Sequence, residues 1–157
     1  MNLQEILRGA ERIVICGIGN ENRGDDAFGV VVTERLRKVL QKPNVTVINC
    51  GEVPESYTGV IKRHKPDAVI FIDAIEFGGK PGEIIVADPE GTLGTSASTH
   101  SLPLRVLVQY LKTELKGTRF ILIGCQPKNT ALFGEMSEEI KKSVEELVRI
   151  LIDSLKD

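Results

Sequence analysis

The segment ERIVICGIG, residues 11–19, decides the fold class of this chain. Its β-branched and apolar run predicts a buried strand at about 12–17, closed by glycine. A second run, DAVIFID at 67–73, is apolar between its two aspartates, which is typical of a central parallel strand covered on both faces. Helical patterns follow both runs. Because strands alternate with helices, we predict an α/β protein: a three-layer α/β/α sandwich with a mostly parallel five-stranded sheet.

The remaining elements follow from the same periodicities. Short β-branched runs predict three more strands, at 44–50, 83–87 (a sheet edge) and 118–125. Apolar stripes at helical spacing predict helices at 26–41, 56–64, about 99–115, and from Ser137 onward. In the third helix, the residues expected to face inward are Leu102, Val106, Leu107, Tyr110 and Leu111. Residues 88–98 are small and polar and predict a loop.

Composition limits the possible partners. Residues 1–157 suit one domain with one core, and 20 basic against 22 acidic residues give a formal charge of −2. Such a chain has no electrostatic footprint for nucleic acid or anionic lipid. No apolar run approaches the ~20 residues of a membrane span, and the N-terminus does not read as a secretory signal. Three cysteines, none at CxxC spacing, indicate reduced thiols, and we expect a cytoplasmic protein.

Candidate functional residues gather where parallel strands end. In an open α/β sheet, ligands bind outside the carboxyl ends of the strands. The first strand is followed by Gly-Asp-Asp at 24–26, and the strand at 67–73 ends in Asp73, so neighbouring strands would bring these acids together. His100, one of two histidines, follows a polar loop. Two carboxylates and a neutral imidazole make a credible site for nickel, zinc or manganese.

Each of these residues also has a structural interpretation. Asp25 suits the N-cap of the following helix, and the helix dipole alone accounts for an acid at Asp26. Asp73 is harder to explain in this way, because an acid ending an apolar strand is costly unless it is paired or coordinating. His100 taken alone suits a surface position near a helix start. His64, in the sequence KRHK, is expected to be a solvated side chain.

Other catalytic motifs are incomplete. Gly17 and Gly19 suggest a dinucleotide turn, but Asn22 stands where the third glycine would fall, and no P-loop lysine follows. Ser98 and Ser101 flank His100 without a GxSxG elbow. The cysteines at 16, 50 and 125 lie late in predicted core strands, where buried apolar thiols are expected.

Taken together, the motifs resemble those of a known family. Gly-Ile-Gly-Asn (17–20), Gly-Asp-Asp-Ala-Phe-Gly (24–29), Asp73, His100 and Gly-Cys-Gln-Pro (124–127) occur in the order seen in the [NiFe]-hydrogenase maturation endopeptidases. Gly-Glu-Val-Pro-Glu (51–55) and Ser-Thr-His-Ser-Leu-Pro-Leu (98–104) are similar to the branch that serves formate-hydrogenlyase-type (hydrogenase 3) enzymes. Cys125 stands where the family often has an aliphatic residue.

The resemblance implies an activity and a partner. Such endopeptidases remove a C-terminal extension from the [NiFe]-hydrogenase large-subunit precursor after nickel insertion. Carried over by position, the metal contacts are Asp26, Asp73 and His100, with Asp26 and Asp73 as the catalytic acids. The nickel would come with the substrate, zinc or cadmium could take its place, and the chain would be a monomer in isolation.

Two mechanisms and two rival functions stay open at this stage. The metal either acts as a Lewis acid, or only positions the substrate while Asp26 or Asp73 serves as general base. A nickel-sensing scaffold or chaperone would bind the precursor without cutting it. In the plainest alternative, the chain is an α/β domain whose acids are helix caps.

Overall fold

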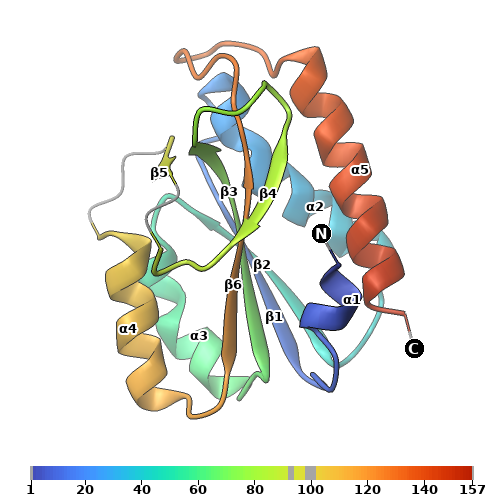
Figure 1. Cartoon of the computed structure of the whole chain (residues 1–157), viewed down its shortest axis with the longest axis vertical. Coiled ribbons are helices and arrows are strands. Elements are labelled where there is room, and N and C mark those ends of the chain that lie inside the picture. The colour runs from blue at the N-terminus through green and yellow to red at the C-terminus, as the bar shows by residue number, and fades with distance from the viewer. Residues whose placement is uncertain (1, 92–93, 98–101, 157) are drawn as a thin grey trace.

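The computed structural model describes residues 2–91, 94–97 and 102–156. Its centre is a mixed sheet in the order β2-β1-β3-β6-β4 (Figure 1). Four strands run parallel: β1 (Ile13–Ile18), β2 (Val45–Gly51), β3 (Ala68–Glu76) and β6 (Arg119–Cys125). Strand β4 (Ile84–Ala87) lies antiparallel at the edge beside β6. The predicted α/β class and mostly parallel sheet are confirmed.

Helices cover both faces of this sheet. One face carries α1 (Leu3–Ile6), α2 (Phe28–Val39) and α5 (Glu138–Ser154), and the other carries α3 (Thr58–Arg63) and α4 (Leu104–Glu114) (Figure 1). Two 3₁₀ turns, η1 (Gly24–Ala27) and η2 (Pro54–Tyr57), precede α2 and α3. None of the helices in the described ranges combines the length and the apolar character needed to cross a membrane.

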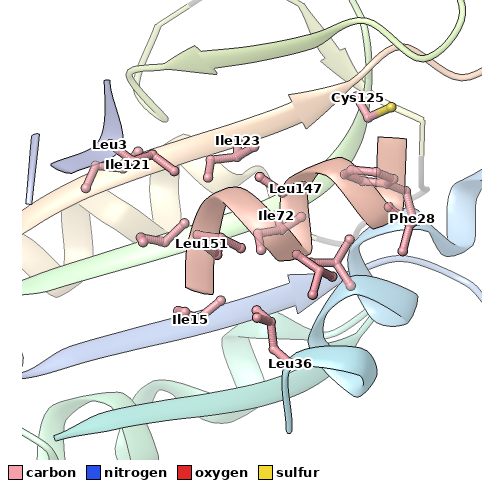
Figure 2. Close-up of a cluster of buried hydrophobic side chains, with 14 of the residues drawn as sticks. Leu3, Ile15, Phe28, Leu36, Ile72, Ile121, Ile123, Cys125, Leu147 and Leu151 are labelled. Carbon is pink, nitrogen blue, oxygen red and sulfur yellow. The ribbon is translucent and has the colours of Figure 1, made fainter. Parts of the chain in front are cut away.

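Alternation along the strands produces a core on each side of the sheet. In β3, Ile70 and Ile72 face α2 and α5, whereas Val69 and Phe71 face α3 and α4. Figure 2 shows the larger cluster, in which strand isoleucines meet Phe28 and Leu36 of α2 and Leu147 and Leu151 of α5. Complete burial of each such side chain contributes about 1.5–3 kcal/mol.

Glycines let α2 approach the sheet backbone to backbone. A Cβ on Gly17 would lie 2.3 Å from the carbonyl oxygen of Gly29, and a Cβ on Gly29 would lie 2.1 Å from the carbonyl oxygen of Ile72. Gly17, one of the two glycines that suggested a dinucleotide turn, therefore serves helix–sheet packing. One turn later, the hydroxyl of Thr33 donates to the Gly29 and Val30 carbonyls, at 3.1 and 3.0 Å.

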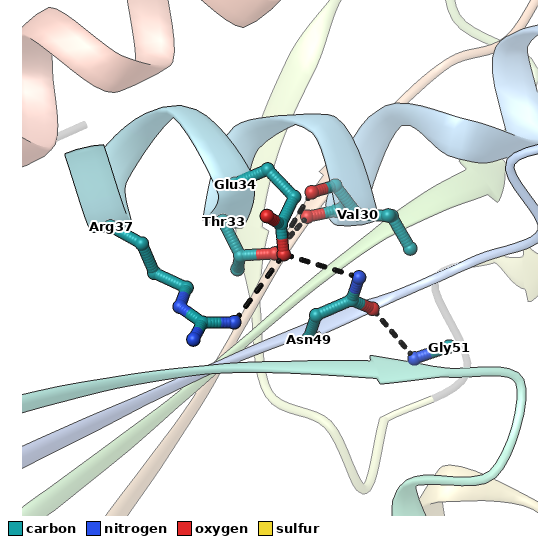
Figure 3. Close-up of polar contacts among 7 residues, drawn as sticks. Val30, Thr33, Glu34, Arg37, Asn49 and Gly51 are labelled. Carbon is teal, nitrogen blue, oxygen red and sulfur yellow. Dashed lines mark hydrogen bonds and ion pairs between the residues drawn. The ribbon is translucent and has the colours of Figure 1, made fainter.

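A polar cluster ties the other side of α2 to the end of β2 (Figure 3). Glu34 accepts hydrogen bonds from Asn49 at 3.3 Å and from Arg37 at 3.5 Å. Asn49 in turn accepts the backbone N–H of Gly51, at 3.0 Å, where the chain leaves β2. These contacts fix the start of the segment 51–55.

Three sequence predictions need correction. A sixth strand, β5 (Thr95–Ser96), lies in the segment predicted as a loop and pairs with the end of β3. The helix predicted from about 99 begins at Leu104, although 99–101 lie outside the described residues. Pro103 disfavours helical backbone at the residue before it, and this explains the later start.

The predicted inward face of this helix is also partly wrong. Leu107 and Leu111 are buried as expected, but Val106 and Tyr110 are exposed, and Val108 is buried instead. The buried stripe is therefore narrower than the apolar pattern suggested. Tyr110 reaches across to α3, where Lys62 donates to its hydroxyl at 2.7 Å and lies 5.0 Å from its ring centroid.

The close contact between α2 and the sheet at Gly29 leads to a prediction about stability. Gly29→Ala should lower the free energy of unfolding by about 1–3 kcal/mol, because its Cβ meets two backbone carbonyls that cannot move independently of the sheet. Gly59→Ala in α3 is the control: no heavy atom lies within 4 Å of the added Cβ, so stability should stay the same or rise by up to about 1 kcal/mol. Urea unfolding measures both, and equal midpoints for the two variants would contradict this packing.

Candidate active site

Asp26 lies in the turn that joins β1 to α2. The chain leaves β1 at Gly19, whose φ of +153° favours glycine and whose Cβ would lie 2.0 Å from the carbonyl oxygen of Asp26. The backbone N–H of Asn20 donates to Oδ2 of Asp26 at 3.2 Å. Asp26 is fully buried. The loop is therefore folded back on the acid, and this explains the Gly-x-Gly-Asn sequence in physical terms.

Asp73 lies in β3, one residue beyond Ile72, which forms the last pair between β3 and β1. Ser96 of β5 donates its hydroxyl to Oδ2 of Asp73 at 2.6 Å, and Asp73 is buried. Strand alternation places its side chain on the face of Val69 and Phe71, toward α3 and α4. The short strand β5, absent from the sequence prediction, thus supplies a donor to the strand-end acid.

Both acids belong to the carboxyl edge of the sheet. Asp26 is three residues before Gly29, and Asp73 directly follows Ile72, whose carbonyl touches Gly29. The η1 turn packs against β3. Topology therefore brings the two acids to one edge, as expected for neighbouring parallel strands.

The third predicted metal contact, His100, lies outside the described residues. The described segment nearest before it is held beside Asp73, because Ala97 donates its N–H to the carbonyl of Ala74 at 2.9 Å. Within the described ranges, no group of three or more His, Cys, Asp or Glu side chains is arranged to hold a metal ion. The three-residue metal site stays a prediction.

A cleft of about 470 Å³ opens beside Asp73. Its walls include Ile75 and Leu122 from the sheet, Leu104 from α4, and Pro89 and Gly94 from the chain between β4 and β5, with Arg105 as a cation. Clefts of this size, mostly apolar with a few polar groups, are typical of sites that bind small ligands or short chain segments. The cleft therefore has the size for a short chain segment, and Asp73 is part of its lining.

Asp25 does not cap its own helix, so that interpretation is wrong. Its carboxylate points to the β6–α5 connection and accepts the N–H groups of Lys128, Asn129 and Ser137 at 2.9, 2.8 and 2.6 Å. The hydroxyl of Ser137 donates to the same carboxylate at 2.8 Å. Ser137 is the N-cap residue of α5, as predicted, but its side chain bonds to Asp25 rather than to the helix. A buried carboxylate with four donors therefore joins the turn before α2 to the connection between β6 and α5, two segments that we call the site rim.

Gln126, the residue directly after β6, performs a similar task for the turn after β3. Its side-chain oxygen accepts the N–H groups of Phe77 and Gly79, at 2.9 and 3.1 Å, and its amide nitrogen donates to Glu76 at 2.7 Å. This buried amide fixes the turn after β3. Sequence reasoning identified Gly-Cys-Gln-Pro as a motif but did not assign this role to the glutamine.

The three cysteines are buried, as predicted. Burial raises the pKa of the Cys125 thiol to about 12. A hydrogen bond with Cys50, together with burial, raises the pKa of Cys16 well above its usual range. Cys125 belongs to the core under α5, on the face opposite Asp73. Thiolate chemistry at neutral pH is therefore disfavoured at Cys16 and Cys125.

Comparisons with known proteins agree with these features. A family model for hydrogenase maturation protease, HycI, matches residues 30–154. The [NiFe] hydrogenase maturation protease HycI from Thermococcus kodakarensis KOD1 is 54% identical, with a TM-score of 0.91 over 99% of each chain. The hydrogenase 3 maturation protease of Escherichia coli K12 is 31% identical, covering 85% of this chain and 83% of the relative. HybD, a hydrogenase maturating endopeptidase of E. coli, is 21% identical over 92% of this chain and 91% of its own, with a TM-score of 0.77, and shares the fold.

These matches define the chain as a peptidase, and hence a hydrolase. Among peptidases, it belongs to the HycI family of hydrogenase maturation proteases. The resemblance read from the sequence motifs, including the hydrogenase 3 branch, is thereby confirmed.

The Asp25 network predicts a loss of stability. Asp25→Asn places an amide against buried donors, and we expect the free energy of unfolding to fall by about 2–3 kcal/mol. Asp88→Asn is the control, because Asp88 also accepts a backbone N–H, at 2.9 Å from Glu90, but is exposed. Its effect should stay within about 0.5 kcal/mol. Thermal unfolding of both variants checks this, and an unchanged Asp25→Asn protein would refute the structural role.

Proposed function

We propose that this peptidase removes the C-terminal extension of a [NiFe]-hydrogenase large-subunit precursor after nickel insertion, and that it recognises the nickel carried by the precursor. Asp26, Asp73 and His100 would contact that nickel. Family membership supports the reaction class and the kind of partner. The metal belongs to the substrate in this proposal.

One observation carries the proposal: two buried carboxylates, 47 positions apart in sequence (73 − 26), lie at the same edge of the sheet, one of them beside an open cleft. Burying a carboxylate is costly unless donors or a cation compensate. Asn20 and Ser96 supply donors to them. A divalent ion arriving with the substrate would add the strongest compensation, and carboxylates with an imidazole suit nickel.

Hydrolysis requires few further groups. A water oxygen bonds to the scissile carbonyl carbon, the peptide C–N bond breaks, and the proton lost by the water passes to the leaving amine. Asp26 or Asp73 would accept that proton as general base, with the nickel holding the precursor in place. In the other mechanism, the substrate's nickel polarises the carbonyl.

The direct test compares precursors that differ only in nickel. Purified chain is incubated with nickel-loaded and nickel-free precursor, and the products are weighed by mass spectrometry. We expect loss of a C-terminal peptide from the nickel-loaded form alone, and no cleavage when free nickel is added to precursor without insertion.

Three outcomes would contradict the proposal. Equal cleavage of both forms would reject nickel recognition. Cleavage of generic peptides after addition of zinc would indicate an ordinary metallopeptidase. A stable complex of unchanged mass would favour the non-catalytic scaffold.

Strand β3 provides a matched pair of carboxylates for mutagenesis. Asp73→Asn keeps an oxygen for the Ser96 hydroxyl but removes the charge, and should slow release of the extension at least about 100-fold. Asp67 precedes the same strand at its other end and accepts the N–H groups of Glu11 and Arg12, both at 2.8 Å. The Asp67→Asn variant should process precursor at a rate within about twofold of that of the unmodified chain, because Asp67 lies at the other end of the strand from the reacting groups. Equal rates for the two variants would remove Asp73 from the site.

A further inference from the structure

The β6–α5 connection holds an apolar projection out to solvent. Leu132 and Phe133, which we name the apolar tip, expose 53% and 78% of their surfaces. Phe133 is the most exposed large apolar residue in the part of the chain that the structure describes. The connection runs over the carboxyl end of the sheet, close to the start of α2, as the orange trace in Figure 1 shows.

The backbone under the tip is held in a costly conformation. Phe133 has a φ of +60°, a region that bulky residues rarely adopt. Its N–H donates to the carbonyl of Asn22 at 2.5 Å, and Gly134 donates to Ala131 at 2.9 Å. The base is fixed by the Asp25 carboxylate, through Lys128, Asn129 and Ser137. The tip is therefore preorganised. The exposure of its apolar side chains and the positive φ of Phe133 both lower the stability of the chain when no partner is bound.

The tip is continuous with the candidate active site. Asn22, which accepts the Phe133 N–H, belongs to the loop that carries Asp26. Asn22 also lines a groove of about 220 Å³ together with Glu21 and Glu52, so a polar, acidic surface borders the tip. A protein bound at the tip would therefore touch the same loop that supports Asp26.

We propose that the apolar tip is a docking anchor for the folded body of the large-subunit precursor, as distinct from its scissile extension. A projecting aromatic side chain needs a concave apolar pocket, which a folded surface offers and an extended peptide does not. The acidic groove beside it fits basic groups around that pocket. Rigid, preorganised aromatic anchors are typical of residues that dominate binding energy. This inference rests on the proposed function for the identity of the partner.

The test separates binding from cleavage. Nickel-loaded precursor is titrated into each variant by calorimetry, and processing rates are measured separately over a range of precursor concentrations. Phe133→Gly should raise the dissociation constant and the half-saturating precursor concentration at least tenfold, with the rate at saturation within twofold. Leu132→Ser should act in the same direction. Because glycine relieves the positive φ, Phe133→Gly should unfold at the same temperature or a higher one, which excludes damage to the fold as the cause.

Val39→Ala is the matched control, since Val39 is also exposed but ends α2 at the opposite end of the sheet. Val39→Ala should change neither the dissociation constant nor the half-saturating precursor concentration by more than twofold. Unchanged affinity in both tip variants would overturn the inference, and so would a lower saturating rate at unchanged affinity. If sedimentation shows a dimer that Phe133→Gly dissociates, the occupant is a second copy of the chain and the precursor assignment is wrong.

Failure of the proposed function gives a different pattern. If the unmodified chain binds the precursor without releasing a peptide, the proteolytic proposal fails, while a tip-dependent affinity still supports the anchor. If the unmodified chain does not bind the precursor at all, the anchor proposal falls with it.

Discussion

At Gly17 and Gly29, helix α2 rests on the sheet with no side chain between the two backbones, since a Cβ at either position would meet a carbonyl oxygen within 2.3 Å. This contact sets the height of α2 above β1 and β3. The turn before the helix folds back over Gly19, and that path brings Asp26 to the carboxyl edge. The packing of α2 on the sheet and the position of Asp26 therefore depend on the same backbone contact.

The site rim is built from buried polar residues that bind backbone. Asp25 and Gln126 each satisfy N–H groups on loops that no regular element holds. In a low-dielectric interior, such fully bonded groups are rigid, whereas the loss of one partner is costly. The rim therefore holds the turn before α2, the turn after β3 and the apolar tip in fixed relative positions.

Hydrophobic periodicity predicted the layers, the parallel strands and the edge that carries the acids, because burial of whole faces dominates those features. It could not predict the partner of Asp25, since the donors lie 103 to 112 residues further along the chain. The helix-cap rule considers only residues close in sequence, whereas the carboxylate of Asp25 binds donors that are far away in sequence. Strand β5 was not predicted because a strand of two residues is too short to show an alternating hydrophobic pattern. Val106 and Tyr110 were placed inward because apolar character alone does not show how wide a buried stripe is.

The bond between Asp25 and Ser137 has a consequence for synthesis on the ribosome. Asp25 is translated 112 residues before Ser137. Chains fold from the N-terminal end as they emerge, so β1, α2, β2 and β3 can associate while this carboxylate still lacks its donors. The rim closes only once α5 begins to appear. An incomplete polypeptide therefore holds Asp26 and Asp73, the proposed catalytic acids, without the frame that orients them, and that frame is completed only when Ser137 has been added.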